Sequence, residues 1–292
     1  MIKIEYGIET NKKDVTEICK TKLCKNNVIS IPTNDNVRAS YFGDPIVGVE
    51  KCVFVTLNKQ IYKFDIHEKL IIHNNFILSS INIIDKLNLK HSNLKFDYGN
   101  IKEELPEQLM SVISLNGDEK VLELGANIGR NTLVIASILN NSNNLVTFEC
   151  DKQSSNMLTH NRDINNLKFN IETCALSKRK LIQKGWDTIP SNTLLNGYKW
   201  VNTITLQQLK QKYNINFDTL VLDCEGAFYY ILLDMPEILN NIKKIIIEND
   251  YSDINHYNFM KNKLVENNFN LVFNEAGGWG PCSDFFYQIW AK

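Results

Sequence analysis

The sequence has 292 residues, more than one average domain needs, so we expect either one large domain or two unequal ones. Its 32 lysines and arginines against 33 acidic residues leave a net charge of −1, which excludes a strongly basic protein, and no nucleic-acid partner is predicted. The seven cysteines are odd in number and never spaced as C-x-x-C, which favours reduced thiols over a disulfide or zinc framework.

The first part of the chain is expected to be a small β-rich accessory domain at residues 1–94. Residues 51–73 alternate apolar and polar side chains around the turn-like LNKQ at 57–60, which is typical of a hairpin. The charged first residues lack the apolar core of a signal peptide, and no apolar run approaches the ~18 residues of a membrane helix. We therefore expect a soluble, cytoplasmic protein without a membrane partner.

The remainder, residues 95–292, is predicted to be a larger domain in which strands and helices alternate, as in a parallel sheet with helical crossovers. The last two strands are joined only by AGGWGPCS at 276–283, which is too short for a crossover, so the seventh strand must run antiparallel. This predicts an α/β, Rossmann-like seven-stranded methyltransferase fold. Strands are expected at 120–125, 144–150, 169–175, 217–224, 242–249, 269–275 and 284–292, and helices at 131–140, 151–166, 205–213, 226–241 and 254–268.

The loop after the first of these strands, VLELGANIGRN at 121–131, is predicted to bind a nucleoside. Ligands of open α/β sheets lie beyond the carboxyl ends of the strands, where Gly125 and Gly129 fall. A dinucleotide loop needs G-x-G-x-x-G, but Asn127 stands at its second glycine, which disfavours a pyrophosphate. Glu149 ends the next strand, about 20 residues on, where a carboxylate binds ribose hydroxyls. The alternative is that Glu149 caps the following helix.

The runs VLELGANIGRNTLVIASIL, TFECD, ALS, FDTLVLDCEGAFYYIL and IIIEND together resemble the FkbM-like methyltransferases that use S-adenosyl-L-methionine (SAM), over residues 95–292. KRKLIQKGWDTI and GGWGPC are similar to the sugar-modifying members found in large DNA viruses. The resemblance implies O-methylation, often of a carbohydrate, in the host cytoplasm if the chain is viral. Two positions depart from the family pattern: Leu222, rather than a lysine, precedes the D-x-E-G motif, and Phe228 replaces a second glutamate. We expect SAM to contact Glu123, Gly125, Asn127, Gly129, Glu149, Cys150 and Ala175.

A cluster of carboxylates is expected where the fourth and fifth strands end, and three interpretations of it remain open. Asp223, Glu248 and Asn249 resemble the oxygen ligands of Mg²⁺-dependent catechol-type methyltransferases. Alternatively Glu225, Asp223 or His256 acts as a general base without a metal, because a neutral alcohol is a poor nucleophile. The third interpretation is that the carboxylates cap the next helix.

Two loops on the ligand face are candidates for binding the acceptor. Trp186 and Trp279 are suited to stack on a sugar, and Lys184 and Asp187 to hold its hydroxyls; the alternative for each tryptophan is simple core packing, because large aromatics dominate cores as well as sites. We therefore predict a SAM-dependent O-methyltransferase acting on a sugar or glycan hydroxyl. The alternatives are an RNA or small-molecule methyltransferase on the same fold, or an inactive binding module, because fold alone does not prove activity.

Overall fold

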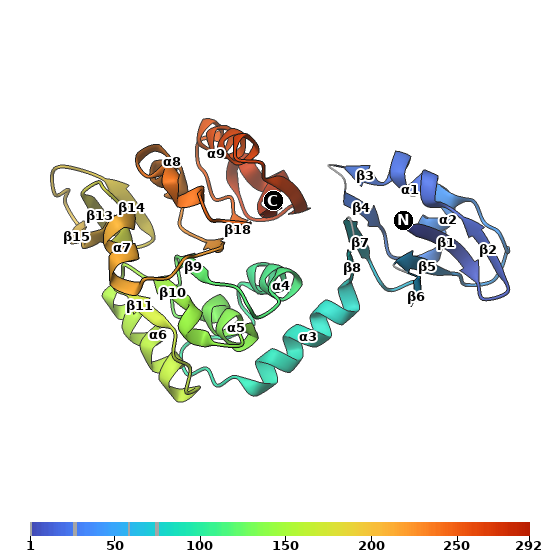
Figure 1. Ribbon diagram of the computed structural model, residues 1–292, viewed down its shortest axis with the longest axis horizontal. Coiled ribbons are helices and arrows are strands. Elements are labelled where there is room, and N and C mark those ends of the chain that lie inside the picture. Colours follow the sequence, from blue (N-terminus) through green and yellow to red (C-terminus); the bar gives the residue numbers. More distant parts are fainter. Residues whose placement is uncertain (1, 26–27, 58, 74–75) are drawn as a thin grey trace. The chain divides into compact units, whose positions relative to one another are not determined.

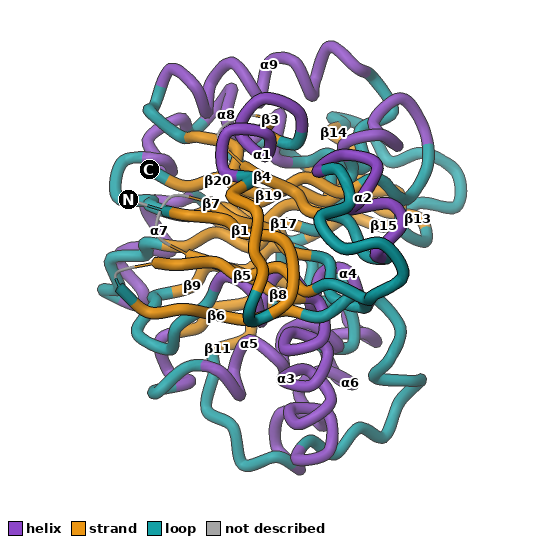
Figure 2. Tube along the Cα trace, turned by 90° about the vertical axis from the view of Figure 1, so that its right-hand side faces the viewer, coloured by secondary structure: helices purple, strands orange, loops and turns teal. Residues whose placement is uncertain are grey.

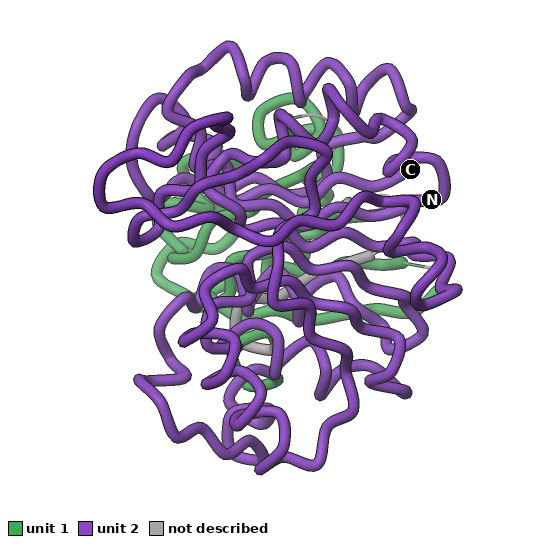
Figure 3. Tube along the Cα trace, turned by 90° about the vertical axis from the view of Figure 1, so that its left-hand side faces the viewer, with its two compact units in different colours: residues 1–86 green, residues 87–292 purple. Residues whose placement is uncertain are grey.

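The computed structural model describes residues 2–25, 28–57, 59–73 and 76–292. The chain divides into two compact units, residues 1–86 and 87–292 (Figure 3). The division falls inside helix α3 (Ser80–Asn93), shortly before the domain boundary that the sequence predicts. Each unit has a cluster of buried apolar side chains of its own.

The first unit is rich in β-structure, as the sequence predicts. Its elements are β1 Lys3–Ile8, β2 Asn11–Asp14, α1 Thr16–Lys22, β3 Cys24–Lys25, β4 Val28–Ile31, α2 Asp35–Phe42, β5 Cys52–Leu57, β6 Gln60–Phe64, β7 Leu70–His73 and β8 Phe76–Ser79. They form two antiparallel sheets, of order β2-β1-β5-β6 and β3-β4-β7-β8. Strands β5 and β6 pair as the predicted hairpin, and residue 58 of the expected LNKQ turn lies outside the described residues.

The second unit is built on a seven-stranded sheet. Its strands are β9 Val121–Leu124, β10 Leu145–Phe148, β11 Asn170–Glu172, β17 Thr219–Leu222, β18 Lys244–Glu248, β19 Asn270–Glu275 and β20 Tyr287–Ala291. Their order is β11-β10-β9-β17-β18-β20-β19, with β20 antiparallel to both of its neighbours. The fold class predicted from the sequence is therefore confirmed, including the reversed last strand.

Helices cover both faces of this sheet. They are α4 Leu105–Ser114, α5 Arg130–Ile138, α6 Lys152–Ile164, α7 Leu206–Tyr213, α8 Phe228–Asp234 and α9 Ile254–Glu266, with short 3-10 helices at Ser142–Asn144, Pro236–Leu239 and Gly280–Phe285. Helices α8 and α9 lie on one side of the strands, and α5 and α6 on the other (Figures 1 and 2). Within the described part of the chain, no helix has the length and apolar character that crossing a membrane requires.

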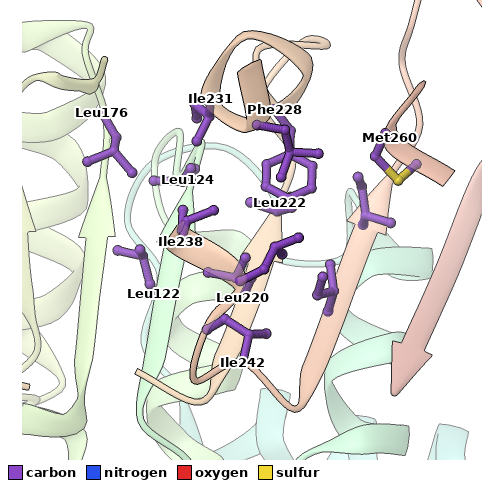
Figure 4. Close-up of a cluster of buried hydrophobic side chains, with 14 of the residues drawn as sticks. Leu122, Leu124, Leu176, Leu220, Leu222, Phe228, Ile231, Ile238, Ile242 and Met260 are labelled. Atoms are coloured by element: carbon purple, nitrogen blue, oxygen red, sulfur yellow. The ribbon is translucent and has the colours of Figure 1, made fainter. Parts of the chain in front are cut away.

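One buried apolar cluster joins the sheet to helices α7, α8 and α9. Leu122 of β9 and Leu220 of β17 belong to it together with Phe228 of α8 (Figure 4). Strands β9, β10 and β17 are buried at every position because helices cover both faces of a parallel sheet. Phe228, which stands where the FkbM-like pattern has a glutamate, is therefore a fully buried core residue.

Two segments differ from the prediction. The helix expected at 226–241 is shorter, because Gly226 lies in the left-handed region at φ 73° and Pro236 disfavours a helical conformation at Met235. Residues 177–200, expected to be a loop, instead supply most of a small antiparallel sheet of order β14-β13-β15, made of β13 Leu181–Lys184, β14 Asp187–Pro190 and β15 Lys199–Val201. Short parallel strands β12 Ala175–Leu176 and β16 Thr203–Ile204 flank it.

Candidate functional site

A cavity of about 360 Å³ opens at the carboxyl ends of the central strands of the second unit. Residues that follow β9, β10 and β17, together with the last residue of β18, line it. This is where an open α/β sheet binds its ligands. The residues predicted for a site that line this cavity are Gly125, Asn127, Glu149, Cys150, Ala175, Trp186, Asp223, Glu225 and Glu248.

The glycine loop turns sharply at Gly125. The N–H groups of Gly125 and Ala126 both donate to the carbonyl of Phe148, at 3.1 and 2.9 Å. Gly125 has a φ of 89°, and a Cβ there would lie 1.5 Å from the carbonyl oxygen of Asp223. Only glycine therefore allows the ends of β9 and β17 to approach this closely.

Glu149 is the carboxylate that faces the glycine loop. Its Oε2 accepts a hydrogen bond from the Asn127 N–H at 2.8 Å, and its Oε1 accepts one from the Asp151 N–H at 2.6 Å. Helix α6 is capped by Asp151, which accepts from the N–H groups of Gln153 and Ser154. The capping role considered for Glu149 thus belongs to Asp151. Glu149 lines the cavity, and burial raises the pKa of its carboxyl.

Two residues expected to contact the cofactor lie outside the described lining of the cavity. A Cβ on Gly129 would be 2.5 Å from Leu158 Cδ1, so this glycine allows α5 to pack against α6. Glu123 is buried in the middle of β9 near Thr132 and Thr147, where burial raises the pKa of its carboxyl to about 7. Both residues therefore lie in the elements that flank the glycine loop, Glu123 in β9 and Gly129 at the start of α5.

Carboxylates gather at the other side of the cavity, after β17 and β18. Asp223, Glu225 and Glu248 line it together with two residues that the sequence analysis missed, Glu104 and Glu107, at the start of α4. Burial raises the pKa of Asp223 well above its usual range, and the neighbouring carboxyl of Asp250 raises it further. Burial and a hydrogen bond with Glu107 raise the pKa of Glu248 to about 11. Glu248 therefore retains its proton at neutral pH.

The capping interpretation of Asp223 and Glu225 does not fit the structure. Helix α8 has Ala227 at its N-cap, and no side chain makes a capping hydrogen bond. Glu225 and Gly226 instead form a left-handed turn, with φ of 51° and 73°. Asp250 holds this turn, because its Oδ1 accepts a hydrogen bond from the Gly226 N–H at 2.8 Å. The D-x-E-G motif thus presents Asp223 and Glu225 to the cavity.

The proposed Mg²⁺ ligands do not assemble. Asn249 is fully buried, and its Nδ2 donates to the carbonyls of Phe285 and Phe286 at 3.0 and 3.2 Å, away from the described cavity lining. Neighbouring residues of a strand point to opposite faces, which separates Asn249 from Glu248. Among the described residues, no three His, Cys, Asp or Glu side chains are arranged to hold a metal ion. The residues present therefore do not fit the metal.

Other predicted residues are also absent from the described lining of the cavity. His256 of α9 stacks on Tyr229, with ring centroids 3.7 Å apart, and is not among the described lining residues, so it is not brought together with Asp223. Trp279 precedes the last 3-10 helix and is half-exposed, outside the same lining. Asp187 accepts a hydrogen bond from the Tyr198 hydroxyl at 2.5 Å, and Lys184 lies over the Tyr198 ring.

Glu104 and Glu107 had a signal in the sequence that could have revealed them. Helix α4 buries Glu107, Gln108 and Ser111, and polar residues on the core-facing side of a short helix indicate a site. Glu104 is held in place by Arg130 at 2.8 Å, and its Oε1 also accepts from Asn127 Nδ2 at 3.3 Å. Arg130 thereby connects the glycine loop to the segment that carries the missed acids.

Comparisons with known proteins add little beyond the fold. No protein-family model matches the sequence, and no curated protein matches it. The chain is similar to the solved structure of the O-methyltransferase from Bacillus cereus in complex with SAH, at 16% identity, 73% of this chain, 91% of that chain and a TM-score of 0.41. It is also similar to the ribosomal protein L11 methylase from Lactobacillus delbrueckii subsp. bulgaricus, at 12% identity, 68% of this chain, 81% of that chain and a TM-score of 0.41. At these TM-scores the likeness carries no argument about activity.

The acid cluster predicts an unusual pH dependence of stability. Glu248 has a pKa of about 11 in the folded protein, against an ordinary value of 4.5. Between these two pH values the folded state therefore binds more protons than the unfolded chain. The contribution of Glu248 to stability is complete below pH ~4.5 and is lost as pH rises toward the folded pKa. We expect Glu248→Gln to raise the free energy of unfolding at pH 8 by about 1 kcal/mol or more.

Urea unfolding followed by tryptophan fluorescence measures this effect, because Trp186, Trp200, Trp279 and Trp290 all lie in the second unit. Glu237→Gln, at an exposed position of a 3-10 helix, is the control and should keep the wild-type pH profile. A Glu248→Gln variant with the wild-type slope between pH 5 and 8 would contradict the prediction.

Proposed function

We propose that the second unit is a SAM-dependent methyltransferase that transfers a methyl group to a hydroxyl oxygen, with a sugar or glycan as acceptor. The observation that carries this proposal is a single cavity with two different ends. Glu149 and the glycine loop, after β10 and β9, lie where a nucleoside would bind. The carboxylates Asp223 and Glu248 lie farther along the same edge of the sheet, at the ends of β17 and β18. The sequence resemblance to FkbM-like enzymes supports the same class of reaction.

The residues at the first end fit the nucleoside part of SAM. Glu149 offers two carboxylate oxygens to the ribose hydroxyls, and Gly125 and Asn127 bring the backbone to the edge of the cavity. A volume of about 360 Å³ lies in the range of small-molecule sites. SAM would supply a methyl group on a positively charged sulfur, and this charge favours the ionised form of nearby carboxyls.

Asp223 is the residue we assign to the acceptor hydroxyl. The carboxylate accepts the hydroxyl proton while the new carbon–oxygen bond forms and the carbon–sulfur bond breaks. Its raised pKa makes it a stronger proton acceptor than an ordinary carboxylate, provided that it is ionised at the moment of transfer. Holding the hydroxyl in line with the methyl group supplies much of the remaining acceleration.

A carbohydrate acceptor is supported by Trp186 at the mouth of the cavity. This side chain lines the cavity and is 68% exposed, so its ring is available for stacking on the apolar face of a sugar. The resemblance of KRKLIQKGWDTI to sugar-modifying enzymes points the same way. Trp279, Lys184 and Asp187 have no place in this proposal because they lie outside the described lining.

Substitution of Glu149 tests the cofactor assignment. Glu149→Ala should weaken SAM binding by roughly 10- to 100-fold, because charge-assisted hydrogen bonds to the ribose are lost. Isothermal titration calorimetry measures the change, and Glu237→Ala, at an exposed position, is the control. Unchanged affinity in Glu149→Ala would remove Glu149 from the ribose site.

Incubation of the full chain with methyl-labelled SAM and a broad panel of saccharides tests the acceptor class. Label should pass to a hydroxyl of a saccharide in the wild type and far less in Glu149→Ala at limiting SAM. Transfer to RNA or protein but to no saccharide would make the carbohydrate assignment wrong. Binding of SAM without transfer to any acceptor would favour the inactive binding module.

A further inference from the structure

Gln183 of β13 has a buried and unused hydrogen-bond acceptor inside the cavity. The side chain lines the cavity and is only 5% exposed. Its Nε2 donates to Cys150 Sγ at 3.3 Å, whereas its Oε1 has no hydrogen-bond partner. Buried polar atoms without a hydrogen-bond partner are rare because they destabilise the fold. A ligand that donates a hydrogen bond to Gln183 Oε1 would remove this cost.

The small sheet fixes the orientation of Gln183. Strand β13 pairs with β14 on one side, placing Gln183 opposite Thr188, and with β15 on the other. Thr188 also lines the cavity, and its hydroxyl lies 3.9 Å from Cys150 Sγ. With Nε2 held by Cys150 and its strand paired on both edges, the amide presents Oε1 in a preorganised direction.

The strand order locates Gln183 relative to the proposed cofactor. Cys150 directly follows Glu149 after β10, and β10 and β11 lie on one side of β9. Strands β17 and β18, with Asp223 and Glu248, lie on the other side. A nucleoside with its ribose at Glu149 and its reactive end toward Asp223 would place its base on the side of the cavity that Cys150 and Gln183 line.

We propose that Gln183 reads the nucleobase, with its Oε1 accepting a hydrogen bond from the exocyclic amino group of a 6-aminopurine. This inference rests on the proposed function. An acceptor-only oxygen favours an amino group and disfavours a carbonyl at the same ring position, which would bring two acceptors together. Gln183 is thus a specificity-determining residue for adenine over hypoxanthine, supplied by a segment that the sequence analysis assigned to acceptor binding.

Calorimetry with two probes tests the inference. The probes are S-adenosylhomocysteine (SAH), the product of methyl transfer from SAM, and S-inosylhomocysteine, which carries a carbonyl in place of the amino group. We expect the wild type to bind SAH roughly 10- to 100-fold more tightly than the inosyl compound, because the mismatch leaves a buried acceptor unpaired. Gln183→Met keeps the size of the side chain but removes the acceptor, and should bring the ratio of the two affinities close to one.

Two further variants separate base reading from a general effect on structure. Gln183→Glu retains an acceptor oxygen and should keep a preference for SAH, while Gln207→Met, at an exposed position of α7, should behave as the wild type. A ratio that stays at the wild-type value in Gln183→Met would overturn the inference. So would equal binding of both probes by the wild type, an outcome that leaves the proposed function standing. Failure of the wild type to bind either probe would instead overturn the proposed function.

Discussion

Asp223→Asn is expected to lower the rate of methyl transfer by roughly 10²- to 10⁴-fold while leaving SAM affinity nearly unchanged. The amide cannot accept the acceptor's proton, so the loss falls on the transition state. Binding of the nucleoside is assigned to Glu149, which follows β10, and to the glycine loop, which follows β9, whereas Asp223 follows β17. Turnover of labelled SAM and calorimetry on the same preparation measure the two quantities.

The substitution should not unfold the protein. Burial raises the pKa of Asp223 well above its usual range, so a neutral amide of the same shape is compatible with its surroundings. Glu237→Gln is the matched control at an exposed site. Turnover at the wild-type rate in Asp223→Asn would refute the general-base role. Loss of wild-type activity after exhaustive chelation, restored by Mg²⁺, would favour the metal interpretation instead.

Gly125→Ala is expected to lower the free energy of unfolding of the second unit by about 3 kcal/mol or more. The new Cβ would stand 1.5 Å from the carbonyl oxygen of Asp223, so β9 and β17 would have to separate. The φ of 89° adds strain for any residue with a side chain. Urea unfolding followed by tryptophan fluorescence reports on this unit, and Trp290 of β20 lies buried within the sheet.

Gly185→Ala separates the clash from the backbone strain. Gly185 also has a positive φ, of 59°, but a Cβ there would meet no atom within 4 Å. We expect it to cost only about 1–2 kcal/mol. Equal losses in the two variants would show that the close approach of Asp223 to Gly125 contributes nothing to the stability of the unit.

Local patterns in the sequence were sufficient to predict the sheet of the second unit. Strands β9, β10 and β17 are buried at every position, and a continuous apolar run between helical segments is typical of a parallel strand. The reversed last strand followed from the short connection at 276–283. The glycine loop and Glu149 were recognisable because their positions relative to two strand ends are set by neighbours in the chain.

The assembly of the cavity depended on contacts between distant segments, which local patterns do not encode. Glu107 lies more than a hundred residues from Asp223 and reaches the same cavity only because α4 packs against the sheet. Gln183 faces Cys150 because a segment expected to be a loop pairs into its own small sheet.

Asn249 shows why some site residues could not be predicted from the sequence. Its sequence position beside Glu248 suggested a shared metal site, but successive residues at a strand end point to opposite faces, and its amide is held by Phe285 and Phe286. By itself the sequence determined which residues belong to strands, turns and the nucleoside loop, since these depend on near neighbours. Which carboxylates share one cavity, and which polar atoms are left unpaired inside it, was decided by packing between segments far apart in the chain.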